Sequence, residues 1–167
     1  MYRVVLAVLA ASVVIAPTAG ADPTFVIERD VNIGGFPRDG NVRAAIATFG
    51  QPSRRDGEFS TCTLFWSRWG LSMKTHYPGG DVDPCGVEAR HASSTVTDRR
   101  WRTSAGLKIG NPVARIRARY PRAVNEGKGL WRLTTRMFAR LPFAGLEAKV
   151  SKGRIVSFTI YGPRNPW

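Results

Sequence analysis

Cysteine, histidine and carboxylate side chains are scarce in this sequence, and each shortage excludes a class of function. Two cysteines and two histidines occur among 167 residues. Cys62 and Cys85 lack the C-x-x-C spacing of a redox motif, and neither His76 nor His91 has a second cysteine, histidine or carboxylate at a recognised metal spacing. We therefore expect no metal site and no cofactor.

Catalytic motifs are missing as well. The sequence contains no G-x-S-x-G, no phosphate-binding loop and no dinucleotide fingerprint. Ser72, His76 and Asp81 supply the residue types of a Ser-His-Asp triad. Exported chains commonly contain such a combination, so it does not indicate catalysis. We expect a protein that is not an enzyme.

Long hydrophobic runs are also absent. The apolar run 4–16 follows Arg3 and precedes Ala19-Gly20-Ala21, a small-x-small cleavage site. The run is shorter than the roughly 18 residues that span a bilayer, so a retained membrane helix is the weaker alternative. We expect residues 1–21 to be a signal peptide, cleaved near Ala21, and the mature protein to be secreted or otherwise extracytoplasmic.

Export changes how the two cysteines are interpreted. In an oxidising compartment an even number of cysteines predicts a disulfide, here between Cys62 and Cys85. The sequence does not show whether the two lie close enough to bond. The mature chain has the length of one compact domain or of two small fused units.

One apolar pattern occurs twice, in residues 41–53 and 111–123. In both stretches apolar residues recur at helical spacing after an asparagine, which predicts a short helix with one buried face and an Asn41 or Asn111 N-cap. Glycine or proline then ends each helix. The equivalent apolar pairs are Val42 and Val113, Ala45 and Ile116, and Phe49 and Tyr120.

Alternating segments follow each expected helix and predict antiparallel strands. Cys62 to Trp66 alternates strictly, and Lys152-Gly153 is a favourable turn between two strand-like runs. Because helices this short do not persist alone in water, we expect them to pack on these strands. The predicted fold class is α+β, with two tandem units of a short helix packed on antiparallel β-strands, the first covering residues 22–95 and the second 96–167.

These signals are similar to those of a known family. Gly40, Val42, Phe49, Gly50 and Pro52, followed by strands that contain Trp66, resemble the opening of a unit in the beta-lactamase inhibitor protein-like superfamily, which small outer-membrane assembly lipoproteins share. The stretch "GLKIGNPVARIRARYPRA" looks like the second unit of two-unit members. The resemblance implies a protein-binding scaffold outside the cytoplasm, sometimes an inhibitor that applies a concave sheet to its target. The residue directly after the expected cleavage site is not a cysteine, unlike in the lipoproteins. No residue of the inhibitory members' loops can be matched to a position in this sequence.

Positive charge is unevenly distributed along the chain. The full sequence carries a net +13. Residues 22–98 contain eight Lys or Arg against ten Asp or Glu, a net −2, whereas residues 99–167 contain sixteen against two, a net +14. The expected second unit therefore carries the whole excess.

Five arginines of the second half are candidate binding residues. Arg115, Arg119 and Arg122 stand at i, i+4 and i+7, which predicts a basic stripe along the second helix. Arg132 and Arg136 are expected on the polar face of the following strand. The planar guanidinium of arginine pairs two-pronged with carboxylate or phosphate. The alternative is a solvated basic surface with no specific partner.

The tryptophans are candidates for either the core or an interface. Trp66 and Trp131 are in phase with apolar strand positions, so we expect them in the core. Trp69, in a turn beside an arginine, and Trp101, between two arginines, are the expected exposed binding aromatics.

Two functional hypotheses follow. The first is a secreted, non-catalytic module that binds an extracytoplasmic protein, with inhibition as one form of that binding. The alternative is a binder of anionic cell-envelope polymer or lipid headgroups through the Arg-rich second unit. Nucleic acid is the least favoured partner, because no recognition motif is present and export removes the protein from it. The sequence does not set the oligomeric state.

Overall fold

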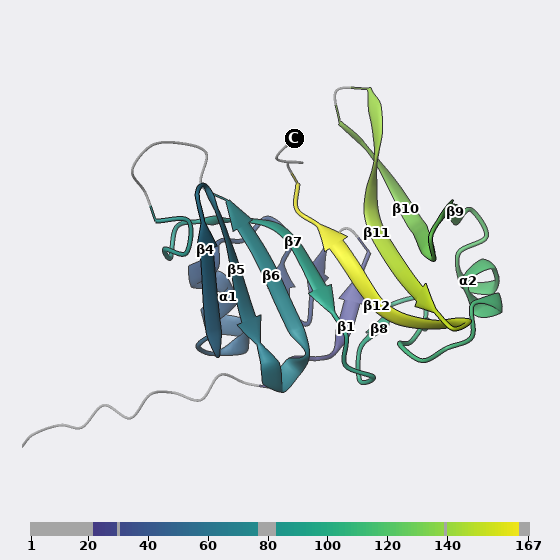
Figure 1. The fold of residues 1–167 in the computed structure, drawn as a ribbon, viewed down its shortest axis with the longest axis horizontal. Coiled ribbons are helices and arrows are strands. Elements are labelled where there is room, and N and C mark those ends of the chain that lie inside the picture. Colours follow the sequence, from purple (N-terminus) through teal and green to yellow (C-terminus); the bar gives the residue numbers. More distant parts are fainter. Residues whose placement is uncertain (1–21, 30, 77–82, 139, 164–167) are drawn as a thin grey trace, which may run out of the picture.

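Two β-sheets contain about 50% of the residues that the structure describes (Figure 1). The computed structural model describes residues 22–29, 31–76, 83–138 and 140–163, and the expected signal peptide lies outside them. The large sheet has eight strands in the order β4-β5-β6-β7-β12-β11-β10-β9, each antiparallel to its neighbours. Their bounds are β4 (Arg54–Glu58), β5 (Thr61–Trp66), β6 (Leu71–His76), β7 (Arg90–Val96), β9 (Val124–Gly127), β10 (Leu130–Phe138), β11 (Leu141–Ser151) and β12 (Arg154–Tyr161).

A small four-stranded sheet lies behind the large one in the view of Figure 1. Its strands, in the order β3-β2-β1-β8, are very short. Strand β1 pairs in parallel with β8, which places Val26 opposite Arg102 and joins the start of the described chain to its second half. The bounds are β1 (Val26–Glu28), β2 (Asn32–Ile33), β3 (Phe36–Pro37) and β8 (Arg102–Thr103).

The first expected helix is confirmed as α1 (Val42–Phe49). The Asn41 side chain accepts a hydrogen bond from the backbone N–H of Ala44 at 3.0 Å, and the helix ends at Gly50. Its buried face packs on the large sheet, where the ring centroids of Phe49 and Trp66 are 5.6 Å apart. Within the described residues, no helix has the length and apolar character needed to cross a membrane.

The second helix, α2 (Ala114–Arg119), begins differently from the expectation. Asn111 does not cap it, because its side chain instead accepts from the backbone N–H of Lys108 at 3.0 Å. The apolar pattern still directs packing, since Ile116 is fully buried and Tyr120 nearly so. A local turn therefore competed for the asparagine and shortened the helix.

Two further local predictions are confirmed. Cys62 and Cys85 form a disulfide, with their Cα atoms 5.2 Å apart. Strands β11 and β12 are joined at Lys152-Gly153, where both residues have the positive φ (48° and 72°) that a tight hairpin turn requires.

The predicted fold class is wrong. Across the described residues the protein is mostly β, with two sheets and two short α-helices, rather than two units of a helix packed on strands. The small sheet occupies much of the layer that the helices were expected to form. Its strands of two or three residues are too short to show a period-2 pattern, and the pairing of β1 with β8 is non-local.

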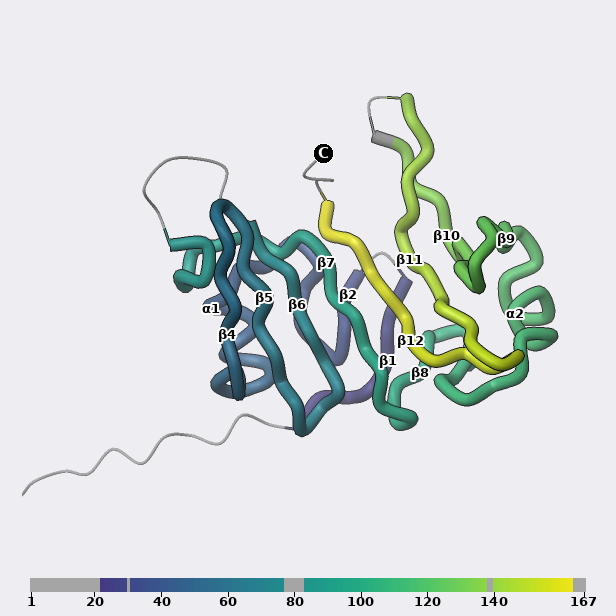
Figure 2. The backbone as a smooth tube through the Cα atoms, in the orientation of Figure 1, coloured from purple at the N-terminus to yellow at the C-terminus, as the bar shows by residue number. Residues whose placement is uncertain are grey.

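One hydrophobic core extends under both halves of the chain. It includes Ile27 and Leu64 from the first half and Ile116 and Phe158 from the second. The backbone trace shows β7 and β12 side by side at the middle of the large sheet (Figure 2), where Ile160 lies opposite Ser94. The predicted division between residues 95 and 96 falls at the end of β7, a strand that also pairs with β6.

Candidate functional site

One face of the large sheet carries short polar side chains instead of core residues. Along β5 the side chains of Cys62, Leu64 and Trp66 are buried against α1 and the small sheet, while Thr61 and Phe65 alternate with them and are partly exposed. The neighbouring strands alternate in the same way. We call the outward set the open face; its members are Thr61, Thr63, Phe65, Ser72, Lys74, Ser93, Thr95, Ser157, Thr159 and Tyr161.

The middle of the open face is a row of hydroxyl groups beside an aromatic ring. The strand register places Phe65 next to Ser72, Ser72 next to Thr95, and Thr95 next to Thr159. The hydroxyl oxygens of Thr95 and Thr159 lie 3.0 Å apart. A shallow hollow of about 270 Å³ adjoins the row, and Arg54 places its guanidinium carbon 4.0 Å from the centroid of the Phe65 ring. Short side chains let another backbone approach this surface closely.

A hydrogen-bonded tyrosine lies farther along the same sheet. Tyr161 donates its phenolic O–H to Glu147 at 2.6 Å. Burial is the first cause that raises the pKa of the Glu147 carboxyl, which is 8% exposed, and burial together with this hydrogen bond raises the pKa of Tyr161 well above its usual value. The hydrogen bond therefore ties the end of β12 to β11.

The structure does not bring the five candidate arginines together. Arg115 and Arg119 are exposed on α2, whereas Arg122 follows the end of that helix. Arg132 forms an ion pair with Glu126 at 3.1 Å. Arg136 donates to three backbone carbonyls; they belong to Tyr161, Gly162 and Pro163.

A β-bulge explains why the strand arginines depart from the predicted common face. The register between β10 and β11 shifts on both sides of Thr134, so Leu133 and Thr134 are consecutive buried residues. Strict alternation from Arg132 to Arg136 is thereby broken. Arg136 holds the end of the described chain against the sheet, which is a structural task.

Two of the candidate arginines meet a third from the other half of the chain. A cavity of about 480 Å³ lies between the end of β1, the loop after β8, the end of α2 and the bulge of β10. We call it the arginine pocket. Its lining residues are Arg29, Ser104, Ala105, Arg119, Tyr120, Pro121, Arg122, Leu133, Thr134 and Thr135.

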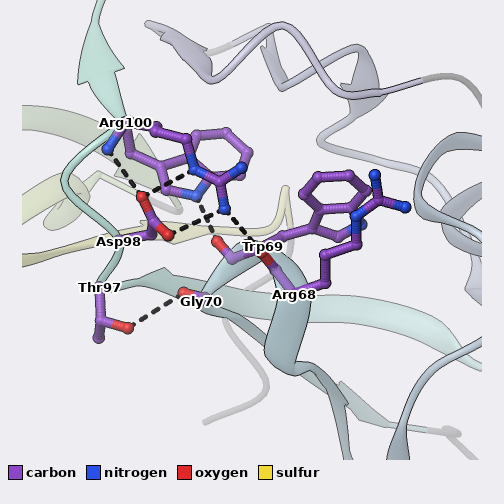
Figure 3. A network of polar contacts seen from close by, with 7 residues as sticks. Arg68, Trp69, Gly70, Thr97, Asp98 and Arg100 are labelled. Carbon is purple, nitrogen blue, oxygen red and sulfur yellow. Dashed lines mark hydrogen bonds and ion pairs between the residues drawn. The ribbon is translucent and has the colours of Figure 1, made fainter.

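The expected exposure of Trp69 and Trp101 is wrong. Trp69 is 4% exposed and Trp101 is fully buried. The Trp101 ring N–H donates to the Trp69 carbonyl at 2.7 Å. Figure 3 shows the neighbouring polar network, in which Arg100 donates to the Arg68 carbonyl and to both oxygens of Asp98. Arg68 and Arg100 lie over the Trp69 ring, with their guanidinium carbons 4.3 and 5.6 Å from its centroid. Trp101 packs edge-on against Phe25, with the ring centroids 5.2 Å apart.

The other two expectations for tryptophan differ in outcome. Trp66 is buried at 2% exposure, and its ring N–H donates to the Gly50 carbonyl at 2.8 Å. Trp131 is only half-buried and packs at the edge of the core, with Arg117 5.6 Å from its ring centroid.

The histidines lie apart from any cluster of metal ligands in the described part of the chain. His91 is 2% exposed, its Nδ1 lies 2.7 Å from the Arg38 carbonyl, and its Nε2 lies 2.9 Å from the Ser94 hydroxyl. Because a carbonyl only accepts, Nδ1 carries the proton and Nε2 accepts from Ser94. Among the residues that the structure describes, no group of three His, Cys, Asp or Glu side chains could hold a metal ion.

Comparison with known proteins gives one distant likeness. No known protein family and no curated protein matches the sequence. The fold is similar to a solved extracellular protein containing a SCP domain from Bacillus anthracis str. Ames, with 10% identity and a TM-score of 0.45 over 75% of this chain. The chain spans 44% of that protein's length.

Sequence reasoning missed the open face and Arg29. The alternation in β5 signalled a two-faced strand, but the order β7-β12 in the sheet depends on a long-range pairing. Arg29 lies in the acidic half of the sequence, so charge counting separated it from Arg119 and Arg122, which the fold places around one cavity.

Proposed function

We propose that this protein is a non-catalytic module that works outside the cytoplasm and binds a protein partner on the open face of its large sheet. The observation that carries the proposal is the row from Phe65 through Ser72 and Thr95 to Thr159, which leaves hydroxyl groups and one aromatic ring facing outward. The resemblance to beta-lactamase inhibitor-like proteins is part of the same proposal, because it implies recognition through a sheet surface.

The chemistry of the open face suits a protein partner. Protein interfaces combine an aromatic centre with polar groups that form hydrogen bonds, and Phe65 and Tyr161 are the aromatic groups here. The hydroxyl side chains supply both donors and acceptors. The disulfide between Cys62 and Cys85 agrees with an oxidising compartment.

The basic second half would act on the rate of association. A field from residues 99–167, which carry a net +14, would attract an acidic partner at long range and weaken with salt. This role does not require the arginines to meet in one site.

Affinity capture with two matched baits tests the proposal. Ser72→Arg places a long charged side chain in the middle of the open face, and Ala47→Arg places the same side chain on the exposed side of α1. We expect the wild-type protein and Ala47→Arg to retain the same partner from envelope and culture fluid, and Ser72→Arg to lose it. Equal retention by both variants would contradict binding on this face.

A second candidate function is supported by the exposed arginines of the α2 region. Arg115, Arg119 and Arg122 present positive charge to solvent, which suits an anionic envelope polymer or lipid headgroups. This hypothesis predicts retention on vesicles that contain phosphatidylglycerol at about 0.15 M salt and release at about 1 M, where the screening length falls to about 3 Å. Retention that does not change with salt would exclude it.

A further inference from the structure

The arginine pocket is a recessed site in which positive charge and apolar surface meet. Arg29, Arg119 and Arg122 line it together, and no carboxylate is among the described lining residues. Its volume of about 480 Å³ lies inside the range of roughly 300 to 1,000 Å³ that is usual for ligand pockets. The combination indicates an anionic ligand of limited size.

The three arginines come from segments that only the fold brings together. Arg29 follows β1, Arg119 is the last residue of α2, and Arg122 lies beyond the helix end at Tyr120. Arg29 and Tyr120 line the cavity together, and burial is the main cause that raises the pKa of the Tyr120 phenol. Guanidinium groups arranged around one cavity favour two-pronged pairing with carboxylates.

The apolar part of the lining distinguishes between anionic ligands. Ala105, Pro121 and Leu133 contribute carbon surface beside the guanidinium groups. A bare polyphosphate or acidic polysaccharide has nothing to place against that surface. Ser104 and Thr135 are exposed and polar, so they give an acyl chain no apolar route away from the pocket.

We propose that the arginine pocket binds an acidic segment of the protein partner, with one or two carboxylates on the guanidinium groups of Arg119 and Arg122 and an apolar side chain against Leu133. The proposal rests on the proposed function, because it assigns the segment to the same partner. The pocket lies on the core side of the large sheet, near the small sheet, so the segment must reach around the sheet from the open face. The pocket thus gives the basic half of the chain a specific contact in addition to its long-range field.

The test uses two double variants that remove equal charge. Arg119→Gln with Arg122→Gln changes the pocket, whereas Arg99→Gln with Lys108→Gln removes two exposed positive charges outside it. The probe is a capped peptide with a leucine between two glutamates, and its glutamine counterpart is the control ligand. Binding to the folded mature protein is measured by calorimetry at about 0.15 M salt.

We expect the pocket variant to bind the acidic peptide about tenfold or more weakly than wild type, and the control variant to stay within about twofold. The glutamine peptide should bind much more weakly to wild type than the acidic one. Equal losses in both variants, or equal binding of the two peptides, would overturn the proposal. The proposal would also be overturned if Arg119 and Arg122 were needed for binding to vesicles that contain phosphatidylglycerol but not for binding to the acidic peptide.

The failure of this proposal can be told apart from failure of the proposed function. If a captured partner is lost with Ser72→Arg but kept with the pocket variant, the open face binds the partner and the pocket does not. If the pocket variant alone releases the partner, the pocket is the binding site and the open face is not.

Discussion

His91 is a buried neutral group whose titration should be visible in the stability of the protein. Burial is the main cause that lowers its pKa from 6.5 to about 4, while hydrogen bonds to the Arg38 and Ser93 backbones act in the opposite direction. Between these pH values the unfolded chain binds a proton that the folded protein does not. The free energy of unfolding should therefore fall as pH is lowered from about 6.5 to about 4, by about 3 kcal/mol in total.

Urea unfolding at a series of pH values measures this effect. A His91→Gln variant lacks the titrating imidazole, so its unfolding free energy should change less within the same window. An identical pH profile for wild type and variant would show that other groups cause the change.

Thr134 holds a buried hydroxyl with no hydrogen-bond partner in the described part of the protein. Leaving such a group unpaired costs about 1 to 3 kcal/mol. Thr134→Val replaces the hydroxyl with a methyl group of similar shape, so we expect the free energy of unfolding to rise by about 1 kcal/mol. Thr135→Val at the exposed neighbouring position is the control, and thermal unfolding is the measurement. A destabilised Thr134→Val would show that the hydroxyl is paired in solution.

Single residues also show where sequence reasoning reaches its limit. Trp66 was correctly placed in the core because its strand alternates, which is a local property. The prediction is wrong for Trp69 and Trp101, because an arginine next to a tryptophan in the sequence does not indicate that the ring is exposed. In the fold Arg68 and Arg100 lie over the Trp69 ring, and Trp101 packs against Phe25. Tertiary contacts of this kind cannot be read from the neighbouring residues in the sequence.

At the scale of elements, the loop 83–89 completes the start of α1. The backbone N–H groups of Val42 and Arg43 donate to the carbonyls of Ala89 and Val87, so the loop satisfies donors that a helix leaves open. The disulfide from Cys62 in β5 to Cys85 holds this loop.

Removing the disulfide should therefore weaken both the whole fold and this helix start. The sequence separation of 23 residues predicts a loss of about 3 kcal/mol for Cys62→Ser with Cys85→Ser, through the entropy of the unfolded chain. Denaturant unfolding gives the loss, and hydrogen exchange should show faster exchange at Val42 and Arg43 than elsewhere in α1. Wild-type stability in the double variant would mean that the loop is held without the bond.

Elements with strong local signals were predictable, and those set by distant pairing were not. Asn41 and Gly50 delimit α1, and Lys152-Gly153 sets a hairpin, through the residues themselves. No sequence pattern indicates the bulge at Thr134, so strict alternation predicts one face for Arg132 and Arg136, which the structure does not show. The short strands of the small sheet are defined by their pairing, such as that of β1 with β8, and have no periodic pattern of their own.

At the scale of the whole molecule, the two halves share one core and one large sheet. In the large sheet β7 of the first half pairs with β12 of the second, and in the small sheet β1 pairs with β8. Each sheet therefore contains strands from both halves. We expect one cooperative unfolding transition in which tryptophan fluorescence and far-UV circular dichroism coincide. Two separated transitions would show that residues 22–95 and 96–167 unfold independently.

Binding of a protein partner at the open face is the central claim, and site-specific photo-crosslinking tests it most directly. A benzophenone side chain is introduced at Ser72, in the middle of that face, or at Ala47 on the exposed side of α1, and the cells are irradiated. We expect a discrete protein adduct from position 72 and none from position 47. Adducts from position 47 alone, or from neither position, would contradict the proposed function.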